Sequence, residues 1–174
     1  MFGHGHSYAV RRLVQQLRER GHEVFVVLQQ GCGEDRLEAN ERLANEYLDV
    51  EDLKQLSLVI ARRFALVGQS AGAMRAVRFA AQSDRVEKLL LLWCPFDPLQ
   101  PVLFSHDKQL EMGEPIQQWS LRWKDNLIRN GLTLQQYDNL VEKTTMMKWD
   151  QIQADRMQLG IEEYYREINI NDLI

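Results

Sequence analysis

A serine between two glycines, in the segment Gly-Gln-Ser-Ala-Gly at 68–72, is the pattern in this sequence with the clearest chemical meaning. A serine hydroxyl is a poor nucleophile unless it is exposed, aligned with a base and placed beside donors that stabilise an oxyanion. A tight turn from a strand into a helix exposes the serine and directs the positive end of the helix toward the reacting carbonyl. Such a turn is crowded, which favours glycine at Gly68 and Gly72. The spacing therefore predicts that Ser70 is a nucleophile for acyl transfer.

The neighbours of Ser70 are expected to supply other parts of this chemistry. The backbone N–H of Ala71, at the start of the helix, is a candidate oxyanion donor, and Gln69 fills the variable position before the serine. The alternative is an ordinary turn in which a serine happens to lie between glycines. The flanking sequence favours the catalytic interpretation, because an apolar run precedes the motif and an alanine-rich stretch follows it.

Short apolar runs predict the strands that must position this turn. They are rich in β-branched, aromatic or leucine residues without alternation, which is typical of parallel strands buried on both faces. The strands are expected at 24–28, 64–67 and 88–93. Helical spacing predicts a helix over 8–20 ended by Gly21, an apolar stripe within 35–62 and a helix from 71 to about 82. Because helices alternate with strands, residues 1–100 are expected to form an α/β fold with a parallel sheet.

Residues 101–174 differ in character and are expected to form a second, mainly helical region. Residues 1–100 carry 13 basic and 13 acidic side chains, so the negative excess lies entirely in this second region. Helices are expected over 108–128, 133–158 and 161–168. Thr133 follows Asn130-Gly131 and is a candidate N-cap for the second of them. The tryptophans and methionines between 119 and 157 fit either an acyl pocket or plain packing between helices.

Composition and charge exclude several classes of protein. A formal net charge of −4, with 45% hydrophobic and 26% charged residues, is ordinary for a globular protein and argues against nucleic-acid binding through a basic face. No apolar run approaches the roughly 20 residues that span a bilayer, and the N-terminus lacks the features of a signal peptide. The two cysteines, Cys32 and Cys94, are too few for a disulfide framework. We therefore expect a cytoplasmic protein without a metal or cofactor.

Four segments resemble the α/β-hydrolase superfamily. Residues 65–72 resemble the family's "LVGHSxGG" segment, the nucleophile elbow, and residues 83–92 resemble its "PDRVxxLVLL" link into the next strand. Residues 3–7 are similar to the oxyanion loop, which begins with His-Gly, and residues 20–24 resemble the turn into the following strand. The resemblance implies a serine hydrolase that acts on a small-molecule ester, thioester or similar acyl bond.

The resemblance also assigns roles away from the turn. Gly5 and His6, in the oxyanion loop, would contribute backbone donors. Asp97 follows the third expected strand, where some members carry their acid, although a turn-forming Asp before Pro98 is the alternative. Residues 101–174 resemble the helical lid that many members insert after that strand.

The sequence departs from the family pattern at both ends. The family's histidine follows the acid late in the chain, whereas the histidines here are His4, His6, His22 and His106. The family's central strand, which separates the strands matched by 24–28 and 64–67, has no counterpart before Met1. We therefore expect a partial α/β-hydrolase sheet, truncated at both ends, whose unfilled edges promote self-association.

Two other functions fit parts of the sequence. A hydrolase-derived pseudoenzyme or fragment that acts as a binding module agrees with the absence of a late histidine. Residues 3–6 followed by 20–24 also resemble the opening of nucleotide-sugar glycosyltransferases, although no second Rossmann-like domain fits the remaining length.

Overall fold

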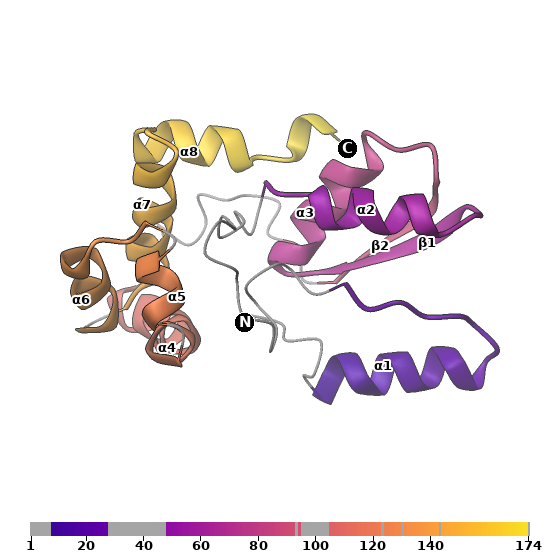
Figure 1. Cartoon of the computed structure of the whole chain (residues 1–174), viewed down its shortest axis with the longest axis horizontal. Helices are drawn as coiled ribbons and strands as arrows, with labels where there is room; N and C mark the ends of the chain where they lie inside the picture. Colours follow the sequence, from indigo (N-terminus) through magenta and orange to yellow (C-terminus); the bar gives the residue numbers. More distant parts are fainter. Residues whose placement is uncertain are drawn as a thin grey trace.

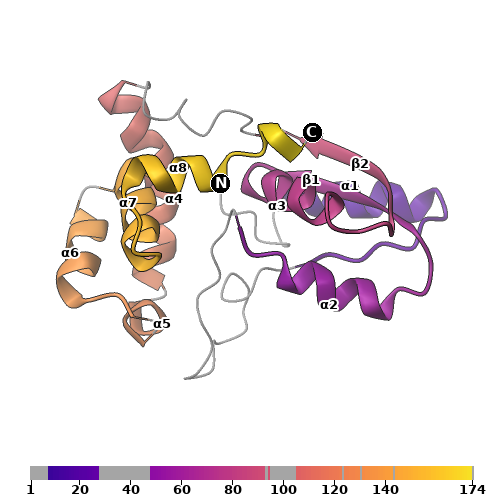
Figure 2. The same cartoon turned by 90° about the horizontal axis from the view of Figure 1, so that it is seen from above.

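The computed structural model describes residues 8–27, 48–92, 94, 105–122, 124–129, 131–142 and 144–173. The elements in these ranges are α1 (Tyr8–Glu19), α2 (Glu51–Val59), β1 (Phe64–Gln69), α3 (Ala71–Ala80), β2 (Val86–Leu92), α4 (His106–Arg122), α5 (Lys124–Arg129), α6 (Leu134–Glu142), α7 (Met146–Arg156), α8 (Ile161–Ile168) and the 3₁₀ turn η2 (Asn171–Leu173). Helices and a small parallel sheet together confirm the mixed α/β class. Figures 1 and 2 show the sheet grouped with α1–α3, and α4–α7 gathered on the other side, with α8 extending between the two groups.

The sheet consists of β1 and β2, which run parallel. Phe64 pairs with Val86, and after one irregularity the register continues from Ala65 opposite Lys88 to Gln69 opposite Leu92. Both strands were predicted from their apolar runs, at 64–67 and 88–93, and α3 is the crossover helix between them. This β1–α3–β2 unit positions residue 70 at the carboxyl end of β1.

The third predicted strand, at 24–28, is not part of this sheet. Residues 22–27 leave α1 as an irregular segment that runs beside the sheet in Figure 1, and residue 28 lies outside the described residues. The prediction was therefore wrong for residues 24–27. Apolar β-branched residues favour an extended backbone, but a strand also requires backbone hydrogen bonds with a neighbouring strand, and residues 24–27 pair with neither described strand.

Only one face of the sheet is covered by the described elements. Gly68 faces α3, whereas Val67 and its pair Leu90 lie on the opposite face and remain 39% and 53% exposed. The expectation of strands buried on both faces was thus wrong for this face. The helix predicted over 8–20 exists as α1, but it buries no residue fully and does not seal the sheet.

Turn residues end and cap the helices as predicted. Gly21, with φ 81, follows α1, and the N–H of His22 donates to the carbonyl of Leu17. Left-handed geometry at this position is the usual reason for a glycine after a helix. Thr133 caps α6, because its hydroxyl accepts from the N–H of Gln136 at 3.2 Å and the Gln136 side chain accepts in return from the N–H of Thr133. These paired bonds form a capping box.

An apolar cluster holds α2 against α3 and the sheet. Val50, Leu53 and Phe79 are buried, and the partly buried side chains around them come from both strands and from Val27. The rings of Phe64 and Phe79 are stacked with centroids 6.3 Å apart. The apolar stripe predicted within 35–62 therefore forms its packing surface in α2, while residues 35–47 lie outside the described residues.

The helices α4–α7 share a separate core. Trp119 and Trp149 lie at its centre, edge to face with centroids 5.6 Å apart. The single helix predicted over 133–158 is two helices, because Thr145 caps a new start at α7 by accepting from the N–H of Lys148. Gly113 of α4 lies directly against Thr144, so a Cβ at residue 113 would collide with the Thr144 carbonyl. The close approach of this turn to α4 therefore requires glycine at residue 113.

Helix α8, predicted at 161–168, joins the two groups. Tyr164, Tyr165 and Ile168 are buried with Met74 and Val77 of α3 in one cluster. Arg78 of α3 donates to the backbone carbonyls of Glu167 and Asn169, which lie at the end of α8. The surface of α3 that carries Met74 and Val77 is thus covered in part by residues of α8.

Candidate functional site

Ser70 occupies the turn between β1 and α3 with an unusual backbone. Its φ of 53° and ψ of −127° lie in a region that residues other than glycine rarely adopt. The N–H of Ser70 donates to the carbonyl of Leu92 at 2.9 Å, and its own carbonyl accepts from the N–H of Ala73 at 2.8 Å. Both bonds hold the strained residue in place, one to the end of β2 and one to the first turn of α3. Strain of about 1–3 kcal/mol at such a residue persists only where the surroundings enforce it.

The two glycines of the motif differ in their surroundings. A Cβ at Gly68 would lie 2.5 Å from the Cα of Ala73 and 2.6 Å from the carbonyl oxygen of Gly72, distances at which the backbone must move. A Cβ at Gly72 meets no described atom within 4 Å. Steric crowding therefore explains why residue 68 is glycine. It does not explain glycine at residue 72, because the collision expected there is absent from the described structure.

The start of α3 presents backbone donors next to Ser70. The first N–H groups of a helix have no partner inside it, and Ala71 is the first residue of α3. Its first turn carries no acidic side chain, and the Ser70 hydroxyl does not cap it. The partial positive charge of the helix end is thus left available to an anion or an oxyanion.

No base contacts the Ser70 hydroxyl within the described ranges. The described histidines are His22, just after α1, and His106, the first residue of α4, and both are exposed. Neither forms a hydrogen bond with Ser70. The predicted site residues Gly5, His6 and Asp97 lie outside the described residues, so the structure neither brings them to Ser70 nor separates them from it.

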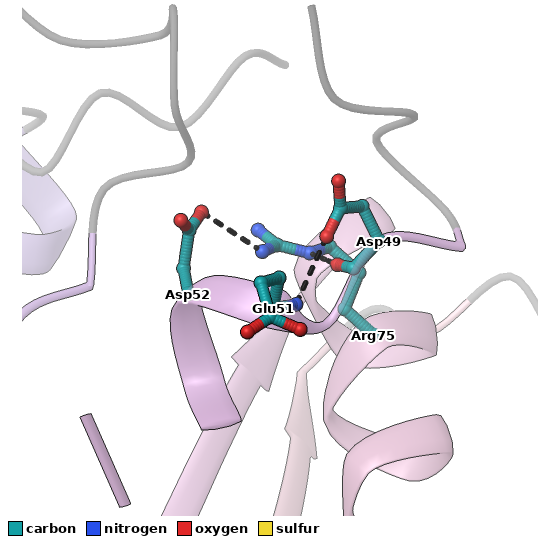
Figure 3. Close-up of polar contacts among 4 residues, drawn as sticks. All are labelled: Asp49, Glu51, Asp52 and Arg75. Carbon is teal, nitrogen blue, oxygen red and sulfur yellow. Dashed lines mark hydrogen bonds and ion pairs between the residues drawn. The ribbon is translucent and has the colours of Figure 1, made fainter. Parts of the chain in front are cut away.

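A buried arginine that the sequence analysis did not single out anchors α3 close to the turn. Arg75 is 7% exposed, and its guanidinium donates to the backbone carbonyl of Asp49 and lies 3.4 Å from the carboxylate of Asp52 (Figure 3). The Asp49 carboxylate accepts from the N–H of Glu51 at 2.9 Å, which orders the start of α2. The available signal was an arginine inside the otherwise small and apolar run from 71 to 77.

Another nucleophilic side chain near the sheet is the thiol of Cys94. Cys94 follows β2 and packs against the cluster between α3 and α8. Burial raises the pKa of the Cys94 thiol, which disfavours the thiolate. This agrees with the structural role expected for a small, partly buried cysteine.

The bulky residues of 119–157 that the structure describes are either packed between helices or exposed. Trp119 and Trp149 are 5% and 3% exposed and fill the space between helices. Met147 and Met157 are exposed instead. Of the two interpretations of these residues, an acyl pocket or packing between helices, the described tryptophans support packing.

The described residues also contain no cluster of three or more His, Cys, Asp or Glu that could hold a metal ion. None of their helices has the length and apolar character needed to cross a membrane.

Comparisons with protein-family models, with curated proteins and with solved structures found no match. The geometry around Ser70 is therefore the feature of the molecule that bears on its function.

Proposed function

We propose that this chain is an α/β-hydrolase-type serine hydrolase of esters, thioesters or similar acyl bonds, with Ser70 as the nucleophile. The observation that carries the proposal is the backbone of Ser70, at φ 53° and ψ −127° between a parallel strand and a helix. A serine that only fills a turn gains nothing from this conformation, since glycine would adopt it without strain. Strained residues of this kind cluster at active sites, where the strain is part of the mechanism.

The proposed reaction uses the groups around the turn. The Ser70 Oγ attacks the acyl carbonyl carbon, and the carbonyl oxygen acquires negative charge next to the N–H of Ala71. The leaving group departs with a proton to give an acyl-enzyme, and water then releases the acid and regenerates the hydroxyl. Gly68 permits the close contact between β1 and α3 that fixes Ser70 at the start of the helix.

No proton acceptor contacts Ser70 among the described residues. Asp97 is the acid that the family resemblance suggests, and Gly5 and His6 belong to the segment that would complete the oxyanion site. A serine without a positioned base loses several orders of magnitude in rate, although binding and oxyanion stabilisation leave residual activity. We therefore expect slow turnover of activated esters by the chain.

A non-catalytic binding module derived from a hydrolase is the second candidate. The specific observation in its favour is that the Ser70 hydroxyl forms no hydrogen bond with any described side chain. In an assembled triad the nucleophile and base lie within hydrogen-bonding reach, although this contact is often looser without substrate.

Labelling with a fluorophosphonate probe distinguishes the two candidates. The enzyme proposal predicts slow covalent labelling of Ser70 and slow hydrolysis of p-nitrophenyl acetate, both lost in Ser70→Ala. The matched control is Ser57→Ala, which removes a half-buried serine on α2 whose hydroxyl donates to the Lys54 carbonyl. Labelling that persists in Ser70→Ala, or no labelling of folded protein, would reject Ser70 as a nucleophile. Rapid stoichiometric labelling would instead show that a base is already in place.

A further inference from the structure

One edge of β1 carries no partner strand among the described residues. Phe64 and Ser70 donate their N–H groups to the carbonyls of Arg85 and Leu92, on the β2 side. Bonding direction alternates along a strand, so the N–H and C=O groups of Ala65, Val67 and Gln69 face away from β2. Within the described residues, β2 is the only strand that pairs with β1. Ala65, Val67 and Gln69 therefore present backbone groups, in register, that no described strand pairs with.

This edge lacks the usual protection against pairing. Exposed edges are commonly blocked by charged side chains, proline or a bulge. Ala65, Val67 and Gln69 carry no charge, and the irregularity of β1 lies before them, between Phe64 and Ala65. Val67 and Leu90 also expose apolar surface on the same sheet face. The edge therefore lacks charged residues that would block strand pairing, and the sheet face beside it exposes apolar side chains.

The segment 22–27 runs beside this edge without bonding to it. Its described ties to the β1 side are an exposed ion pair, with Glu23 Oε2 2.6 Å from Arg62 Nη2, and the partly buried Val27. Exposed ion pairs contribute little to stability. Phe25 and Val26 are 52% and 45% exposed, so the segment adds apolar surface while being weakly held. Among the described residues, this segment is the part that must move aside to admit a second strand at this edge.

We propose that a second copy of this chain occupies the edge, with the two β1 strands antiparallel and a two-fold axis at Val67. The edge is complementary to itself in this arrangement, because Val67 faces its own counterpart and Ala65 faces Gln69. Each facing pair exchanges both of its backbone hydrogen bonds. No charged side chain lies within the paired stretch, since the nearest in the chain, Arg63, falls outside it. The two copies of Val67 and Leu90 then form one apolar strip across the axis, as a two-fold interface requires.

Sedimentation velocity on the full chain tests this dimer. We expect the dimer fraction to increase with protein concentration from about 1 to 200 µM, the range of weak association. Val67→Lys places a charge at the axis and is expected to give a monomer over the same range. Leu134→Lys is the matched control, since Leu134 is 60% exposed on α6, and it should dimerise like the wild type. A wild-type monomer throughout, or a dimer that Val67→Lys does not weaken, would overturn the proposal.

Cross-linking tests the register and direction of pairing. With Cys32 and Cys94 replaced by serine, Val67→Cys should be joined to its counterpart by a short dimaleimide reagent, since facing Cα atoms lie about 5.5 Å apart. Ala65→Cys should cross-link poorly, because its counterpart is displaced by four residues, or about 13 Å along the strand. Leu134→Cys measures the background. Equal cross-linking at 65 and 67 would overturn the two-fold axis at Val67, and cross-linking of neither above background would overturn the edge pairing.

Discussion

Replacing Gly68 by alanine is expected to destabilise the protein, whereas the same change at Gly72 is not. At Gly68 the new Cβ lies 2.5 Å from the Ala73 Cα and 2.8 Å from the Ala76 Cβ, so α3 must move away from β1. Overpacking of a well-packed site costs about 1–3 kcal/mol, and the rigid backbone at Gly68 favours the upper half of that range. At Gly72, inside α3 and with open space around it, alanine gains up to about 0.5–1 kcal/mol of helix preference.

Urea unfolding followed by circular dichroism measures this difference. We expect the midpoint of Gly68→Ala to fall and that of Gly72→Ala to stay or rise, with unchanged slopes. For a chain of this length, each kcal/mol corresponds to roughly 2–4 °C in the melting temperature. Equal stability of the two variants, or a Gly72→Ala variant that is the less stable one, would refute the assignment of the close contact to the Gly68 side of the turn.

Three further changes test other contacts of the same region. Ser70→Gly is expected to raise the free energy of unfolding by about 1 kcal/mol, because glycine accepts φ 53° without strain. It should also abolish any labelling by fluorophosphonate. Ser70→Ala should abolish the labelling without raising the free energy of unfolding. Arg75→Met should lower the free energy of unfolding by about 1–3 kcal/mol, since it removes the buried donor to the Asp49 carbonyl and the ion pair with Asp52. Thermal unfolding measures this change, and an unchanged melting temperature would contradict the anchoring role. Burial and the neighbouring Asp150 raise the pKa of Tyr165. The protonated hydroxyl therefore stabilises the fold in full below the unfolded tyrosine pKa of about 10. This contribution is lost progressively as the pH rises above that value. Tyr165→Phe should therefore show a shallower loss of stability between about pH 9 and pH 11 than the wild type, and identical slopes would refute the assignment.

The sequence was most informative where local chemistry decides the structure. The runs at 64–67 and 88–93 form parallel strands around α3, and Gly21 and Thr133 end and cap helices as their types predict. These outcomes depend on contacts within a few residues, or on a pattern that suits only one kind of element. The glycine–serine spacing likewise indicated a turn at Ser70, although the catalytic roles of that turn stay a proposal.

The sequence failed where a distant residue decides. Residues 24–27 have the composition of a strand, but whether they form hydrogen bonds with a strand elsewhere in the chain is not visible in a local pattern. The turn before Thr145 packs against the bare backbone of Gly113, more than 30 positions earlier in the chain, and no local pattern reveals this contact. The burial of Arg75 could not be predicted from the sequence, because it depends on the partners of Arg75 at and before the start of α2. The predicted roles of Gly5, His6 and Asp97 fall outside the described residues and stay predictions.

The contact between α3 and α8 has a consequence for biosynthesis. Arg78 and its acceptor on Glu167 are 89 positions apart, and the residues that cover Met74 and Val77 include Ile168 and Ile170. At about 5–20 residues per second, a ribosome needs roughly 5–20 s to proceed from the first partner to the last. Throughout that time the nascent α3 exposes apolar surface that the finished protein hides. A chaperone that shields this surface is therefore expected to matter during translation, and folding should be completed only after the last helix has left the exit tunnel.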